Sequence, residues 1–334
     1  MSTTAPPPAA KSGTGDVAAL AMKIITNVEK VILGKRSQVV LIVVATLSEG
    51  HVLLEDVPGV AKTMLGRALA RSVNCSFKRV QCTPDLLPTD VTGASIFNQK
   101  VNEFEFRAGP IFAQIVLADE INRATPRTQS ALLEAMGEGH VTVDGITHML
   151  ERPFQVIATQ NPIDHEGTFP LPEAQLDRFL MRLSLGYPGI EEEAKMLTNQ
   201  QRAHPIDSLE PVTSAEEMLQ AQHAIREVFI DEKVRTYLLQ VVARTRSHDD
   251  VRLGGSPRAS LALFRAAQAL AAVRNRKYVL PDDIKRLAGP ILGHRLILKP
   301  ESRLRKVTPT AVVEAVLNEV PVPVPTTEGQ GQFV

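Results

Sequence analysis

Residues 55–63 read E-D-V-P-G-V-A-K-T, and this stretch decides the fold. It follows a short apolar strand, 51–54, and ends in Lys62 and Thr63, where a helix is expected to begin. The free backbone N–H groups and the positive dipole end of a helix start attract anions. We therefore predict a loop that holds the phosphates of a nucleoside triphosphate. Lys62 is expected on the β- and γ-phosphates and the Thr63 hydroxyl on Mg²⁺.

The loop departs from the usual G-x-x-x-x-G-K-[ST] pattern at two positions, because Asp56 stands at the first glycine and Ala61 at the last. Asp56 leaves the shape of the loop backbone open. An ordinary strand-to-helix turn is the alternative for this stretch taken alone. The residues expected to bind the nucleotide here are Asp56, Val57, Pro58, Gly59, Val60, Ala61, Lys62, Thr63 and Met64.

A second polar strand end lies at residues 115–120, which read I-V-L-A-D-E. The apolar run suits a buried parallel strand, and two carboxylates that point in different directions follow it. We expect Asp119 to hold Mg²⁺ through its water shell and Glu120 to polarise the water that attacks the γ-phosphate. The alternative is a solvated Asp-Glu pair that caps the following segment.

A third apolar strand, 154–158, ends in T-Q-N-P. Open α/β sheets bind ligands at the carboxyl ends of their strands, so Asn161 is expected to hold the attacking water. Taken alone, Asn161 fits an Asn-Pro turn equally well. Three polar strand ends in this order, however, predict a core that hydrolyses ATP or GTP.

The sequence resembles the MoxR family of AAA+ ATPases over about residues 16 to 318. The resemblance implies that Lys62 and Thr63 form the Walker A motif, that Asp119 and Glu120 form Walker B, and that Asn161 is sensor 1. The strings that carry it are L-E-D-V-P-G-V-A-K-T at Leu54–Thr63, A-D-E-I-N-R-A at Ala118–Ala124, T-Q-S-A-L-L-E-A-M at Thr128–Met136, A-T-Q-N-P at Ala158–Pro162 and L-P-E-A-Q-L-D-R-F at Leu171–Phe179.

Two arginines take their expected roles from the same resemblance. Arg178, in L-D-R-F, matches the arginine finger that reaches the γ-phosphate of a neighbouring subunit, although a surface ion pair with Asp177 or Glu173 is an alternative. Arg258, in G-G-S-P-R-A-S, matches sensor 2, which a helical lid brings to the γ-phosphate of its own subunit. A solvent-facing arginine at a helix start, after Pro257, is the alternative there.

Residues 31–34, V-I-L-G, resemble the apolar box that packs on adenine, which adds Gly34 to the nucleotide contacts. The same run also fits the end of a helix capped by Gly34.

The resemblance implies an α/β fold. Its AAA+ P-loop core has a five-stranded parallel sheet flanked by helices, with β-hairpin inserts, and an all-α lid domain follows at the C-terminus. The expected divisions are a disordered leader at 1–15, the nucleotide-binding domain at 16–187, the lid at 188–320 and a disordered tail at 321–334. Beyond residue 188 the pattern predicts helices only, one of them from Pro257 to Val273.

Residue patterns place one hairpin in 93–110 and a second in 140–150, which turns at Asp144-Gly145. The first hairpin carries Phe97, Phe104 and Phe106. These side chains are expected to form the core of the hairpin, and contact with a substrate is the alternative.

The composition agrees with a nucleotide-binding domain and a lid but would not by itself predict them. The chain has 334 residues, of which 44% are apolar, enough for two domains with their own cores. Lys plus Arg and Asp plus Glu each number 37, so no net field favours nucleic acid or an anionic membrane. The longest apolar run is too short to span a bilayer and the N-terminus lacks a signal-peptide core, so a cytoplasmic location is expected.

Two classes of function fit this core. The first, which we favour, is an ATP-driven, ring-forming and hexameric ATPase that acts as a chaperone-like remodelling or assembly factor. The resemblance implies partners with a von Willebrand factor A domain and roles in cofactor or complex maturation. The second is a slow nucleotide-dependent switch that does no mechanical work. A DNA-acting motor is a third and weaker reading, because the neutral chain shows no basic surface for it.

Overall fold

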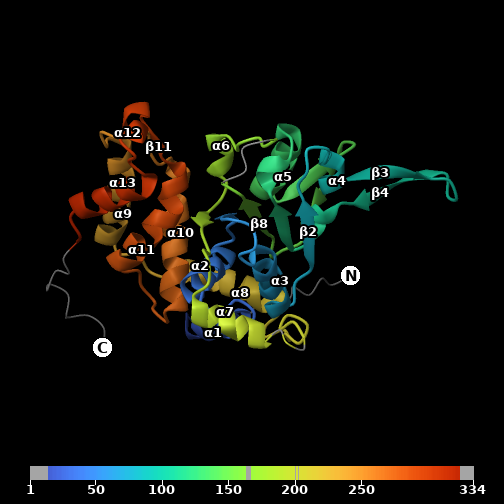
Figure 1. Cartoon of the computed structure of the whole chain (residues 1–334), viewed down its shortest axis with the longest axis horizontal. Helices are drawn as coiled ribbons and strands as arrows, with labels where there is room; N and C mark the ends of the chain where they lie inside the picture. Colours follow the sequence, from blue (N-terminus) through green and yellow to red (C-terminus); the bar gives the residue numbers. More distant parts are fainter. Residues whose placement is uncertain (1–13, 163–166, 200, 202, 324–334) are drawn as a thin grey trace, which may run out of the picture.

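The structure is a computed structural model, and it describes residues 14–162, 167–199, 201 and 203–323. Figure 1 shows a layered α/β body, a helical domain on one side and a two-stranded arm on the other. The leader expected at 1–15 and the tail expected at 321–334 lie outside the described residues, except at 14–15 and 321–323. The first helix already begins at Thr14.

A five-stranded parallel sheet forms the centre of the body, in the order β2-β5-β8-β1-β9. Its middle strands are buried almost along their whole length, as in parallel sheets that are covered on both faces. This confirms the predicted sheet. The strands are β1 (Val52–Glu55), β2 (Phe77–Gln81), β5 (Ile115–Asp119), β8 (Gln155–Gln160) and β9 (Met181–Leu183).

Helices cover both faces of the sheet. Successive residues of one strand point to opposite faces, so Leu54 and Leu117 belong to one apolar core whereas Leu53 and Val116 belong to another. The first core includes α1 (Thr14–Glu29), α2 (Arg36–Leu47), α3 (Lys62–Ser72) and α8 (Ala215–Ala224). The second includes α5 (Pro126–Glu138) and the short α4 (Pro88–Thr92). Two further helices, α6 (Glu173–Leu176) and α7 (Ile190–Asn199), flank β9 in the chain.

The two expected hairpins are present. They are β3 (Gly93–Asn98) with β4 (Glu103–Ala108), and β6 (His140–Val143) with β7 (Ile146–Met149). The second turns at Asp144 and Gly145, which both have positive φ, as this kind of tight turn requires.

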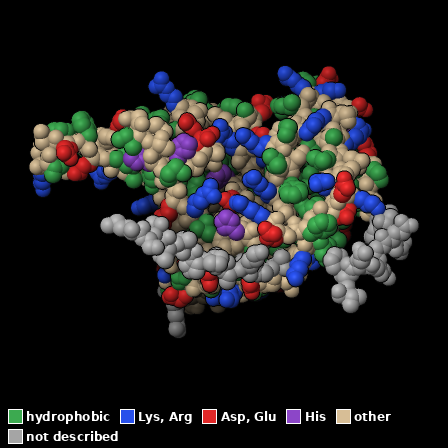
Figure 2. Space-filling view, turned by 180° about the vertical axis from the view of Figure 1, so that it is seen from behind, with side chains coloured by type: hydrophobic (Ala, Val, Ile, Leu, Met, Phe, Trp, Pro, Cys, Tyr) green, Lys and Arg blue, Asp and Glu red, His purple; other side chains and the backbone are tan. Residues whose placement is uncertain are grey.

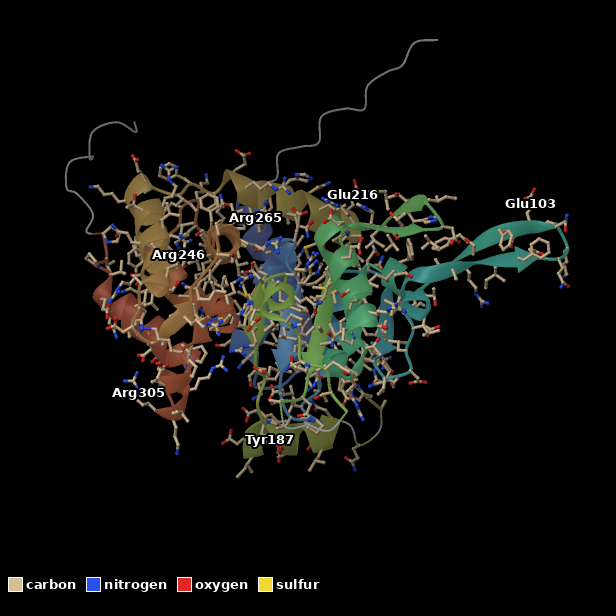
Figure 3. All side chains as sticks on the ribbon, turned by 90° about the horizontal axis from the view of Figure 1, so that it is seen from above. Glu103, Tyr187, Glu216, Arg246, Arg265 and Arg305 are labelled. Atoms are coloured by element: carbon tan, nitrogen blue, oxygen red, sulfur yellow. The ribbon has the colours of Figure 1, made fainter. Side chains whose placement is uncertain are left out.

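The arm β3–β4 extends away from the body (Figures 1 and 3). At its base, Phe106 stacks on His148 of the second hairpin with ring centroids 3.9 Å apart. Nearer the tip, Phe97 and Phe104 contact each other edge to face but are 45% and 72% exposed. The expectation that all three phenylalanines form a hairpin core is therefore wrong for these two, because an isolated two-stranded ribbon has no second layer to cover them.

The C-terminal domain is helical, as expected, and its core continues into that of α1 and α2 through α10. A short antiparallel pair, β10 with β11, was not predicted, because strands this short show no alternating pattern. The helix α8, expected in the lid, packs instead on α1 and α2, since periodicity marks a buried face but not its partner. The elements are α9 (Glu232–Arg246), β10 (Val251–Leu253), α10 (Pro257–Val273), α11 (Pro281–Leu292), β11 (Ile297–Leu298), α12 (Pro300–Leu304) and α13 (Pro309–Glu319). The 3₁₀ turns are η1 (Pro110–Phe112), η2 (Ile121–Arg123), η3 (Ile225–Glu227) and η4 (Gly293–Arg295).

Candidate active site

Polar side chains collect where the strands of the sheet end. The register sets Gln81 beside Asp119 and Glu55 beside Gln160, and Asn161 follows directly and is buried. The structure thus brings the phosphate loop, the Asp119-Glu120 pair and Asn161 to one carboxyl edge, as the sequence predicts. Parallel α/β sheets bind their ligands at such an edge.

The phosphate loop turns sharply between β1 and α3. Gly59 and Ala61 have φ of 86° and 61°, and α3 begins at Lys62. Ala61 stands at the last glycine position of the pattern and adopts the left-handed conformation that a glycine would adopt there. For an alanine this conformation costs about 1–2 kcal/mol. Val60 is buried, Pro58 and Gly59 form the exposed tip, and Val57, Thr63 and Met64 are half-buried.

Lys62 is buried at the start of α3, and its Nζ donates to the Asp56 carbonyl oxygen at 2.7 Å. Burial lowers the pKa of Lys62, and the carboxylates of Asp56, Asp119 and Glu120 oppose that shift. The Lys62 ammonium therefore lies near three carboxylates at the N-terminus of α3.

The Asp56 carboxylate does not face the loop. Its Oδ2 accepts hydrogen bonds from Ser184 Oγ (3.1 Å), from the Gly186 N–H (3.0 Å) and from the Leu185 N–H. The Asp56 side chain is thus turned away from the loop, and a nucleotide contact of Asp56 stays a prediction for its backbone. No local pattern could reveal this use of the side chain, because its partners are more than 125 residues away in the chain.

The two acidic side chains after β5 have different surroundings. Asp119 Oδ1 accepts from Thr159 Oγ1 at 2.6 Å and Oδ2 accepts from Arg79 Nε at 2.9 Å. Glu120 has a positive φ of 57°, which turns its side chain away, and its carboxylate pairs with Arg123 at 3.1 Å. The two carboxylates therefore point in different directions, as their expected roles require.

Thr159 and Arg79 are site residues that the sequence reasoning missed. Thr159 Oγ1 accepts from the Glu120 N–H at 2.8 Å while it donates to Asp119, so one hydroxyl orients both acidic residues. The position of Thr159 in the sequence could have identified it, because it follows the apolar run of β8 directly and precedes Gln160 and Asn161.

The donors at this edge fit Mg²⁺, which prefers oxygen ligands and usually keeps several waters. The Thr63 hydroxyl and the Asp119 carboxylate are the residues that would hold it. Among the described residues no group of three His, Cys, Asp or Glu forms a metal cluster.

Gly34 lies in the turns between α1 and α2, with φ of 69°. Because α1 ends at Glu29, the idea that Gly34 caps this helix is wrong. A side chain at Gly34 would collide with Glu192 of α7, and Lys35 Nζ donates to the Tyr187 carbonyl at 2.7 Å. The segment that follows β9 therefore packs against the expected adenine box.

Arg178 and Arg258 lie at the opposite, amino edge of the sheet. With Arg265 they line a cavity of about 290 Å³ together with Gly50 and His51, the residues that precede β1. Figure 3 shows Arg265 and Tyr187 on opposite sides of the molecule, and Figure 2 shows Lys and Arg side chains gathered near the middle of the face turned to the viewer.

Arg178 Nη1 donates to the Leu133 carbonyl at 2.7 Å. Asp177, one of the two surface partners in the alternative interpretation of Arg178, is bound instead by Arg295 at 2.7 Å and by Ser256 Oγ at 3.0 Å. Among the residues that the structure describes, Arg258 and Arg265 have no ion pair. Two carboxylates, Glu49 and Asp177, also line the cavity, but they pair with Arg226 and Arg295, so the cavity keeps an excess of positive charge.

The structure does not bring Arg258 to the phosphate loop of its own chain. The four-residue strand β1 separates the cavity from the loop, which at ~3.3 Å per residue places the two edges roughly 13 Å apart. In this arrangement α10 packs on α1 and α2. The contact of Arg258 with the γ-phosphate of its own subunit stays a prediction, which this packing does not favour.

The fold and this edge of the sheet define a AAA ATPase domain followed by its lid. Residues 51–181 match the family described as "ATPase family associated with various cellular activities (AAA)", and residues 243–316 match the AAA lid domain.

The chain is 42% identical over 328 residues to "Chaperone MoxR1" of Mycobacterium tuberculosis, covering 96% of this chain and 86% of that protein. It is 53% identical over 309 residues to the uncharacterized protein YeaC of Bacillus subtilis, covering 92% and 97%. A candidate ATPase from Cytophaga hutchinsonii, solved by crystallography, superposes with a TM-score of 0.88 at 37% identity, covering 93% and 97%. The chain belongs to the MoxR family of AAA+ ATPases, as its motifs suggested.

Proposed function

We propose that this protein hydrolyses ATP with Mg²⁺ in an active site that two copies complete. The observation that carries the proposal is the division of the site residues between two edges. Lys62, Asp119 and Glu120 stand at the carboxyl edge. Arg178, Arg258 and Arg265 stand at the amino edge, where none of them has an ion pair within the described part of the chain. An amino edge set against a carboxyl edge is a head-to-tail contact, which closes into a ring when the rotation allows it.

At such a contact each residue has a definite task. Lys62 binds the phosphate chain, Glu120 accepts the proton of the attacking water, and Asn161 orients that water. Mg²⁺, held by Thr63 and Asp119, would supply charge neutralisation. The remaining negative charge would be stabilised by Arg178 of the adjoining copy, a contribution worth about 10³ to 10⁵ in rate in related phosphoryl-transfer enzymes.

Arg258 belongs with Arg178 in this proposal. Both line the same cavity, and Arg258 is the second residue of α10, which Ser256 caps. We infer that it too reaches the nucleotide of a neighbour and not that of its own chain.

The ring, which we propose to be hexameric, acts on other proteins as a chaperone-like remodelling or assembly factor. The name of the Mycobacterium tuberculosis relative supports a chaperone role. The family resemblance supports a partner with a von Willebrand factor A domain. We also propose a cytoplasmic location, on the sequence grounds given above. None of the helices in the described residues combines the length and apolarity that crossing a membrane requires. Nucleic acid is not the proposed partner, since the chain carries equal numbers of basic and acidic residues.

The test is the steady-state ATPase rate of the purified full chain, measured alone, with a von Willebrand factor A domain protein, with an unfolded protein and with duplex DNA. Stimulation by a protein and not by DNA is expected. Stimulation by DNA alone would overturn the choice of partner. A slow rate that no protein changes would favour the nucleotide-dependent switch.

Light scattering in parallel reports assembly. We expect the particle to grow when MgATP or a non-hydrolysable analogue is added. A monomer under all conditions would leave Arg178 without a target and would overturn the shared active site. Calorimetry that detects no binding of MgATP would overturn the whole proposal.

A further inference from the structure

Asp56 makes contacts that reach three different parts of the carboxyl edge. Its backbone carbonyl accepts the Lys62 ammonium at 2.7 Å, and its backbone N–H donates to the Gln160 carbonyl at 3.1 Å, next to Asn161. Its carboxylate is bound to the segment after β9. A single residue thus joins the phosphate-binding lysine, the end of β8 and this segment.

The segment that receives the carboxylate is residues 184–189, which we call the connector. It leads from β9 into α7. Two of its backbone N–H groups and one side-chain hydroxyl converge on Asp56 Oδ2, which is an arrangement that holds an anionic oxygen firmly. Gly186 has φ of 63°, so the connector depends on a left-handed residue to present its N–H.

Beyond this anchor the connector packs on the expected adenine box. Lys35 Nζ donates to the Tyr187 carbonyl, and Glu192 of α7 lies against Gly34. The connector therefore touches the phosphate loop at one end and the base-binding side of the site at the other. Both ends would be affected when a nucleotide binds.

Resting on the proposed function, we propose that Asp56 is a positioning residue that couples the phosphate loop to the connector. Lys62 can exchange its bond to the Asp56 carbonyl for stronger, charge-assisted bonds to phosphate oxygens. The loop backbone at Asp56 is then free to shift, and its carboxylate carries the connector with it. This gives an aspartate a purpose at a position where phosphate loops usually have glycine.

The experiment uses a fluorescent reporter on the connector. The chain contains no tryptophan, and Tyr187 is 71% exposed, so Tyr187→Trp gives a single indole beside Gly186. The full-length reporter protein is titrated with a magnesium-loaded, non-hydrolysable ATP analogue, and calorimetry measures the binding independently. We expect the indole emission to change in proportion to the sites filled.

Asp56→Asn in the reporter removes the charge but keeps one acceptor oxygen. We expect the affinity to change by less than about threefold, whereas the emission change is mostly lost and turnover falls about tenfold. A residue that only stabilised the fold would not separate binding from the connector signal in this way. Thermal unfolding of each variant shows whether the fold is retained.

Ser184→Ala is the matched variant on the other side of the bond. It removes one of the three donors and leaves the phosphate loop sequence intact, so an intermediate emission change is expected. If the Asp56→Asn protein does not fold, the emission change of the Ser184→Ala protein alone tests the coupling. Lys62→Ala in the reporter protein is the control that gives the indole emission when the phosphate-binding lysine is absent.

Two results would overturn the coupling. One is a full emission change in both the Asp56→Asn and Ser184→Ala proteins. The other is a silent indole in the parent reporter although calorimetry detects binding. If the unmodified chain binds no nucleotide at all, the proposed function fails instead, so the two failures are distinct.

Discussion

The carboxyl and amino edges of the sheet differ in how their charges are balanced. At the carboxyl edge these charged groups have partners in the same chain. Lys62 donates a hydrogen bond to the Asp56 carbonyl oxygen. Asp119 forms an ion pair with Arg79, and Glu120 forms one with Arg123. At the amino edge, Arg258 and Arg265 line a cavity without an ion pair among the described residues. The carboxylates that line this cavity, Glu49 and Asp177, are paired with Arg226 and Arg295, so Arg258 and Arg265 suit an anion from outside the chain. This difference supports the proposal that one copy carries two halves of different sites.

The largest effect is expected at the carboxyl edge. Glu120→Gln removes the proposed base but keeps the shape and the hydrogen-bonding atoms of the side chain, so turnover should fall by about 10² to 10⁴ while MgATP still binds. Phosphate release and calorimetry measure the two properties. The control is Glu103→Gln on the distant arm, which should leave both unchanged (Figure 3). Turnover within twofold of the parent would remove Glu120 from the chemistry.

The amino edge is tested by Arg178→Ala. Turnover should fall about 10³-fold with binding retained, because the lost charge acts on the transition state and not on the bound substrate. Mixing this variant with Glu120→Gln should restore activity, since the Glu120→Gln copy still offers its arginine to a neighbour whose base is intact. Arg305→Ala on the lid is the control. Mixtures that form rings yet stay inactive at every ratio would contradict the division between the edges.

A sharper form of the same mixing experiment uses Arg258→Ala, for which a loss of about 10²-fold is expected. If Arg258 serves a neighbour, mixing with Glu120→Gln restores activity. If it serves its own chain, no copy in the mixture has both groups, and activity stays low. The outcome therefore decides between the arrangement in the structure and the one that the sequence suggested.

The smallest effect concerns the floor of the arginine cavity. Burial lowers the pKa of His51 to about 4, and the contact of its Nε2 with the Met136 carbonyl oxygen at 3.0 Å opposes that shift. Its Nδ1 accepts the Val156 N–H at 3.0 Å. The unfolded chain takes up this proton near pH 6.5 and the folded chain only near 4. Stability is therefore complete above pH 6.5 and falls as the pH drops towards 4, by about 2 kcal/mol at pH 5 from this residue.

Urea unfolding at pH 7 and pH 5 measures this loss. His51→Gln should lower stability at pH 7 but should lose less between the two pH values than the parent does, because glutamine does not titrate. Equal losses in the parent and the variant would show that His51 does not contribute to the pH dependence.

Local signals predicted much of this molecule. The helix α10 begins and ends as predicted, because Ser256 accepts the Ala259 N–H as its cap and Pro257 fits its first turn. The parallel sheet and both hairpins also follow from short apolar runs and turn residues. The order of polar strand ends predicted which residues meet at the carboxyl edge.

The features that escaped prediction depend on contacts between distant parts of the chain. The Asp56 carboxylate finds its donors at 184–186, and Thr159 matters because β8 lies beside β5. The place of Arg258 follows from how α10 packs on α1 and α2, which no residue near Arg258 encodes. Sequence motifs indicate which residues act, but the edge at which each one acts depends on tertiary packing.

The arm has a mechanical consequence. From Ala108 the chain passes through η1 directly into β5, the strand that ends at Asp119. At the base of the arm Phe106 stacks on His148, whereas nearer the tip the side chains of Phe97 and Phe104 are exposed. A force applied at those exposed rings would therefore act, through the base of the arm, on the strand that carries Asp119.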